Sequence, residues 1–120
     1  MINYDAAVSR VLLAEFPQEG DIKIYHDKAP EVGDAAYPYI VYRTLSLSPV
    51  FHADNRMWGY QHAVRITVVS KNESAKDVEN RVLTAMETSG YVWQGLNPAV
   101  DDKEYGEKYT ALDFIQSYDA

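Results

Sequence analysis

The sequence predicts an α+β fold, an antiparallel sheet with two helices packed on one face, in the order α-β-β-β-α-β-β. Two segments repeat apolar residues at the 3.6-residue spacing of a helix, and the segments between them have the alternation or composition of strands. The longest strand has only one apolar face, which implies helices on one side of the sheet. A chain of 120 residues has the size of one domain, and we expect a single domain over residues 1–120.

Apolar periodicity predicts the first helix over residues 3–16, with Asn3 as its N-cap and Pro17 ending it. A short strand is expected over residues 22–26, and a loop broken by proline and glycine follows through residue 37.

Pro38 is expected to open a strand over residues 39–45, since proline is tolerated at a strand's first position. Residues 46–55 are interpreted as a loop or a long hairpin tip, and residues 56–70 as the longest strand. The residues on the apolar face of that strand are Trp58, Tyr60, His62, Val64, Ile66 and Val68.

A second helix is expected over residues 74–89, with Ser74 and Asp77 resembling a capping box and Gly90 at the C-terminal cap. A short strand over residues 91–93, a polar loop over 94–104 and a last strand over 105–118 complete the order. The residues expected in the core are Val11, Leu12, Phe16, Val64, Ile66, Val78, Val82, Met86 and Phe114.

The composition excludes several classes of function. Eighteen acidic against eleven basic residues give a formal net charge of −7, which disfavours gripping nucleic-acid phosphates or an anionic membrane surface. The chain has no cysteine, so disulfides, thiolate metal sites and cysteine nucleophiles are excluded. No apolar run exceeds four residues, whereas a spanning helix needs about 20. We therefore expect a cytoplasmic protein without a signal peptide.

Patterns of catalytic or metal-binding residues are weak. His52 and Asp54 share a loop, but two ligands do not make a metal site, and an ordinary exposed loop is favoured. His62 is interpreted as a strand histidine with a hydrogen-bonded tip. Four acids near the C-terminus are interpreted as a solvated face, and they are Asp101, Asp102, Glu104 and Glu107. We expect no enzyme, no cofactor and no metal.

Aromatic residues are the most distinctive feature, with ten Tyr, three Phe and two Trp. Tyr and Trp are enriched at protein–protein interfaces, and the planar guanidinium of arginine is common in interface anchors. The candidate interface surrounds the hairpin tip and consists of Phe51, His52, Asp54, Arg56, Trp58 and Tyr60. The alternative interpretation is that this segment folds back and caps the domain's own core.

The succession of these segments resembles the small tail-completion or tail-terminator proteins of long-tailed bacteriophages and of prophages in Gram-positive bacteria. The resemblance covers nearly the whole chain. The segments that carry it are Phe16-Pro17, Tyr37-Pro38-Tyr39-Ile40-Val41-Tyr42, Ser48-Pro49-Val50, Asp54, Val68-Val69-Ser70-Lys71, the helix over residues 75–86, Gly90-Tyr91 and the strand through Phe114.

This resemblance implies a ring, typically of six subunits, that sits on the tail tube, ends its polymerisation and presents a surface to the head connector. The expected partners are other copies of the chain, the tail tube protein and head connector proteins, in the virion or in the host cytoplasm during assembly. DNA is expected only to pass through the channel, which suits an acidic protein. The family has no catalytic residues to transfer.

Three alternatives remain open from the sequence. Head–tail adaptor and stopper proteins have a similar size. A monomeric binding module could use the same aromatic surface for a small ligand or a peptide. A small enzyme would need a site built from His52, Asp54 and Arg56, with perturbed ionisable groups converging in a cleft.

Overall fold

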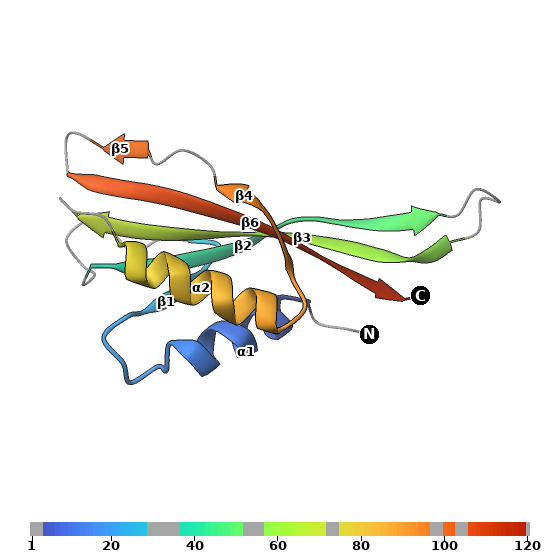
Figure 1. Ribbon diagram of the computed structural model, residues 1–120, viewed down its shortest axis with the longest axis horizontal. Coiled ribbons are helices and arrows are strands. Elements are labelled where there is room, and N and C mark those ends of the chain that lie inside the picture. Colours follow the sequence, from blue (N-terminus) through green and yellow to red (C-terminus); the bar gives the residue numbers. More distant parts are fainter. Residues whose placement is uncertain are drawn as a thin grey trace.

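The computed structural model describes residues 4–28, 37–51, 57–71, 75–96, 100–102 and 106–119. Helices α1 (Tyr4–Glu15) and α2 (Lys76–Thr88) lie side by side on one face of a single sheet (Figure 1). The predicted α+β fold class is confirmed.

The sheet has the order β1-β2-β3-β6-β4, and a short strand, β5, also pairs with β6. Its strands are β1 (Ile24–His26), β2 (Tyr39–Phe51), β3 (Met57–Lys71), β4 (Val92–Leu96), β5 (Val100–Asp102) and β6 (Glu107–Asp119).

Two details of the sheet differ from the prediction. Strand β1 runs parallel to β2, so the sheet is mixed rather than wholly antiparallel. The connection over residues 27–38 is long enough for the chain to cross back and run in the same direction. The segment 94–104, expected to be a loop, contains the end of β4 and all of β5, which pairs with the first residues of β6.

The core lies between the helices and the facing side of the sheet. Every predicted core residue is buried except Val11, which is partly buried against the same cluster. The predicted alternation of β3 is confirmed at His62, Val64, Ile66 and Val68, which are all buried. The opposite face of the sheet carries no described helix. On it, the residues of β3 from Gln61 to Thr67 are half-buried, whereas Val69 is 1% exposed.

The two ends of α2 differ in how they are capped. Gly90 has a φ of 94°, and its N–H and that of Tyr91 donate to Glu87 and Met86, a Schellman motif. At the other end the N-cap is Ala75, which makes no side-chain cap, so the structure does not show the predicted capping box. Ser74, like the predicted cap Asn3 of α1, lies outside the described residues.

Strands β2 and β3 extend well past the two helices (Figure 1). Strand β2 was expected to stop at residue 45 but continues to Phe51 through Pro49. A proline without an N–H is tolerated there because no described strand pairs with that side of β2 beyond Tyr42. We call residues 43–51 of β2 and 57–62 of β3 the arm, and the helix-covered remainder the body.

Candidate functional site: the arm and the sheet edges

The predicted interface residues lie on and around the arm. Phe51 and Trp58 belong to β2 and β3, although their side chains lie outside what the structure describes. Tyr60 is half-buried, opposite Pro49 on one side and Tyr118 on the other. The other three predicted residues, His52, Asp54 and Arg56, lie outside the described residues.

The outer strand of the arm is exposed over its whole described length, residues 43–49. Leu45 is 45% exposed and Leu47 is 44% exposed, although large aliphatic side chains are usually buried. The pairing register shifts between Thr44 and Ser46, so Leu45 is the extra residue of a bulge, and Leu47 then lies opposite His62. Neither leucine was among the predicted interface residues, although the alternation Leu45-Ser46-Leu47-Ser48 beside a proline is typical of an edge strand.

The opposite edge of the sheet is also apolar and exposed. Strand β4 pairs with β6 on one side and with no described strand on the other. Its Val92 is 58% exposed and its Trp93 is 38% exposed. Apolar surface is therefore presented at both lateral edges of one sheet.

A series of polar side chains in contact with one another lies where the arm joins the body. Thr44 Oγ1 is 2.7 Å from Asp5 Oδ1 and 2.9 Å from His62 Nε2. Because a carboxylate only accepts, the Thr44 hydroxyl donates to Asp5 and accepts from Nε2–H of His62. Asp5 Oδ2 lies 3.5 Å from Nε2 of His26, which stacks on Tyr42.

These hydrogen-bonded side chains are not arranged for nucleophilic catalysis. His62 is fully buried and donates to Thr44, so it cannot also take that hydroxyl's proton. Its Nδ1 is buried without a partner in the described part of the molecule. Burial lowers the pKa of His62, against a smaller opposite effect of Asp5, and this favours the neutral ring. The predicted hydrogen bond at the histidine tip is confirmed for one ring nitrogen.

A second polar cluster lies at the other end of the sheet, around Glu107. The prediction that Glu107 belongs to a solvated face is wrong, because the residue is 1% exposed. The Tyr37 hydroxyl donates to its Oε2 at 2.8 Å, and the Tyr109 hydroxyl donates to its Oε1 at 2.7 Å. Burial and the adjacent charge of Glu107 raise the pKa of Tyr39 to about 12. Both carboxylate oxygens accept hydrogen bonds from tyrosines, so the cluster holds the segment before β2 against β6 and offers no free base.

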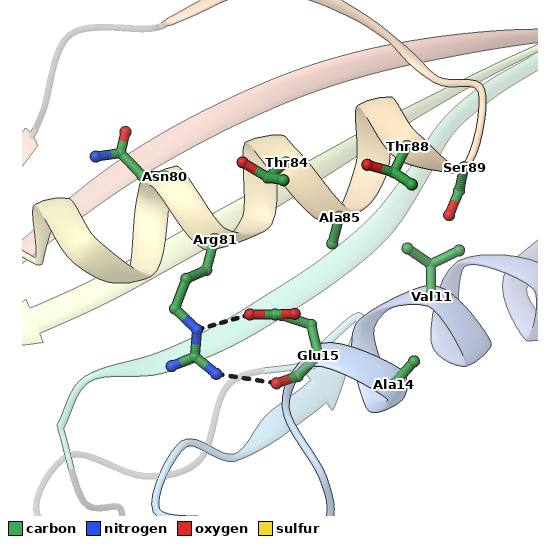
Figure 2. Close-up of a pocket in the computed structure, with 9 residues that line it drawn as sticks. All are labelled: Val11, Ala14, Glu15, Asn80, Arg81, Thr84, Ala85, Thr88 and Ser89. Carbon is green, nitrogen blue, oxygen red and sulfur yellow. Dashed lines mark hydrogen bonds and ion pairs between the residues drawn. The ribbon is translucent and has the colours of Figure 1, made fainter.

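The helices form an open groove of about 480 Å³ on their outer side (Figure 2). Its two charged residues bind each other, since Arg81 Nε lies 2.8 Å from Glu15 Oε1 and Arg81 Nη2 donates to the Glu15 carbonyl at 2.9 Å. The same guanidinium lies over the Phe16 ring, 4.4 Å from its centroid. Arg81 and Glu15 thus link α2 to α1 across the groove. The residues that line the groove do not form a set of reactive groups.

Within the described ranges, no three His, Asp or Glu side chains come close enough to hold a metal ion together. None of the helices in this part of the chain has the length and apolar character needed to cross a membrane. The chain matches no protein-family model, and no curated protein is significantly similar to it.

Proposed function

We propose that this chain is a structural subunit of a phage or prophage tail, which caps the tail tube as a ring and forms part of the head–tail junction. The observation that carries the proposal is the arm, which extends past the helix-covered body and exposes Leu45 and Leu47. A single copy of the chain leaves this apolar surface in water, which favours a protein that is completed by assembly.

The distribution of exposed apolar residues supports a ring over a monomeric binding module. A closed ring needs heterologous contacts, in which one surface of a subunit meets a different surface of the next. The chain has two such surfaces on opposite edges of one sheet, with Leu45 and Leu47 on β2 and Val92 and Trp93 on β4. A module that binds a small ligand would instead gather apolar and polar groups in one concave pocket.

The net charge of −7 supports the same proposal. A ring that surrounds a DNA channel must let the phosphate backbone slide, and an acidic protein provides few cations to hold it. The head–tail adaptor and stopper proteins remain the alternative within the same class of assembly proteins.

The test is complementation of a phage or prophage that lacks the gene for this chain. The parent chain restores infectious particles, whereas Leu47→Asp leaves unjoined heads and tails in electron micrographs. The matched control is Leu13→Asp on α1, because Leu13 is similarly exposed, at 41%, but lies away from the arm. A second variant, Phe51→Ala with Arg56→Ala, tests the predicted tip in the same assay.

The outcomes separate the classes of protein. Tails of uncontrolled length without the chain indicate a tail terminator, whereas tails of normal length that fail to join heads indicate an adaptor or stopper. Normal infectious particles without the chain would contradict a role in assembly.

A further inference from the structure

Among the described residues, the sheet ends in two edges with which no further strand pairs, and these edges belong to different strands. On one side, β1 covers β2 only as far as Tyr42, so residues 43–51 have no described strand beyond them. On the other side, β4 is the outermost strand beside β6. Such edges present rows of unpaired N–H and C=O groups, which are templates for pairing with another chain.

The directions of these two strands are complementary. Each of the pairs β2–β3, β3–β6 and β6–β4 is antiparallel, so β2 and β4 run in opposite directions within one copy. Copies related by rotation about an axis along the strands keep their strand directions. A β4 placed beside the free edge of β2 in the next copy therefore meets it antiparallel, with the helices of both copies on the same side of the joined sheet.

The side chains at the two edges also match. Both edges carry exposed apolar residues, as described above. On the face of the sheet without helices, Arg43 lies directly opposite Arg65, a like-charge pair that is unfavourable by itself. Arg65 binds Asp113 through two hydrogen bonds, of 2.8 and 3.0 Å, whereas Arg43 has no acidic partner among the described residues.

The rows across the sheet fix where the two edges can meet. In a joint without a shift, Leu96 would lie in the row of Tyr42, which is already paired with His26 of β1. A shift of two residues toward the tip of the arm clears β1 and keeps every side chain on its own face of the sheet. Trp93 then lies opposite Leu47, and both belong to rows on the helix-covered face of the sheet.

We propose that β4 of one copy adds antiparallel to the edge of β2 in the next copy, beyond Arg43 and past the end of β1, so that one sheet continues from subunit to subunit. This proposal rests on the ring assembly proposed above and names the surfaces that close it.

Ser48 and Val92 report on this joint, because the same shift places them opposite each other. Ser48 pairs with Gln61 of β3 and Val92 pairs with Ile115 of β6, so two strands lie between them within one copy. Three strand spacings, roughly 14 Å, therefore separate Ser48 from Val92 within one copy. A disulfide requires Cα atoms within about 7 Å, so the two positions cannot cross-link inside one copy. They become direct neighbours only across the proposed joint.

The experiment uses two single variants, Ser48→Cys and Val92→Cys, in a chain that has no cysteine of its own. Each is expressed alone, both are co-expressed, and a third chain carries both changes. Assembled particles are purified, oxidised and run on non-reducing gels. The control pair is Lys71→Cys with Val92→Cys, because Lys71 is exposed at the end of β3 opposite the arm.

The joint predicts no cross-link for either single variant, a covalent dimer for the co-expressed pair, and a ladder of higher oligomers for the double variant. The control pair stays monomeric on the gel. Cross-linking of either single variant with itself would show an isologous contact and overturn the proposal. So would the absence of any cross-link in particles that contain the chain.

The same samples separate the two proposals. If the chain is required for particles but the cross-link fails, only the joint is wrong. If particles assemble normally without the chain, the proposed function is wrong, whatever cross-links form in purified protein.

Discussion

The body and the arm share strands of one sheet, yet apolar side chains are buried in the body and exposed in the arm. In the body, Val64 and Ile66 of β3 are fully buried beneath the helices. In the arm, Leu45 and Leu47 of the neighbouring strand are almost half exposed. Burial of apolar residues in the core stabilises the body. The leucines of the arm are not part of that core in a single copy of the chain. This difference separates the part of each strand that stabilises the fold from the part that we propose serves assembly.

The largest expected effect is on the free energy of unfolding, when an aspartate replaces an apolar residue in the body rather than in the arm. Val82→Asp buries an unpaired carboxylate between α2 and the sheet and should cost several kcal/mol, on the order of the whole stability. Leu47→Asp puts the carboxylate in solvent and should change the free energy of unfolding by no more than about 0.5 kcal/mol. Urea unfolding measures both. Equal losses would remove the distinction between the two regions.

Glu107→Ala should have the next largest effect. It removes the acceptor of the Tyr37 and Tyr109 hydroxyls in a buried cluster and should destabilise the protein by about 2 kcal/mol. The control is the half-buried neighbour Lys108, whose change to Ala should matter by about 0.5 kcal/mol or less. If the two variants unfold at the same urea concentration, the tyrosine cluster does not stabilise the body.

Gly90→Ala tests the end of α2. A residue other than glycine is strained at a φ of 94°, and the added Cβ would lie 3.1 Å from the Gln116 side chain. We expect a loss of about 1–2 kcal/mol. Gly95→Ala is the comparison, since Gly95 also has a positive φ but no atom lies within 4 Å of the added Cβ. A larger loss at Gly95 in thermal unfolding would contradict the contact with Gln116.

The smallest expected effect is the pH dependence of the junction between arm and body. The pKa of His62 is lowered in the folded protein, so below about pH 6.5 the unfolded chain binds a proton that the folded chain resists. Stability attributable to neutral His62 is therefore complete above that pH and falls as the pH drops toward the folded pKa, by at most about 1.4 kcal/mol per pH unit.

His62→Gln should flatten this part of the curve of unfolding free energy against pH. Identical curves for the parent and His62→Gln would show that the buried ring does not titrate with folding.

Much of the body could be predicted from the sequence, because its signals are local. Alternation along β3 gave the buried face, and the helical spacing of Val78, Val82 and Met86 gave the packed side of α2. The parallel pairing of β1 could not be predicted, since the period of a strand contains no information about its partner's direction. The burial of Glu107 depends on tyrosines that only the folded sheet brings beside it.

The arm was harder to predict for a physical reason. A proline normally breaks a strand, and whether Pro49 does so depends on which edge of β2 is already paired. Exposed apolar residues such as Leu47 and Trp93 have the same sequence pattern as core residues. The predicted tip residues His52, Asp54 and Arg56 lie outside the described part of the chain, and their place in an interface stays a prediction.

Amide hydrogen exchange over residues 43–51 tests most directly the claim that the arm serves assembly. It is measured on the dilute isolated chain and on the chain assembled on purified tail tubes, with the core strand β3 as the internal reference. We expect amides on the outer edge of β2 to exchange rapidly in the isolated chain and to become protected in the assembly, while β3 residues 64–69 are protected in both. Protection of the β2 edge already in the isolated monomer, or rapid exchange that persists in the assembly, would contradict it.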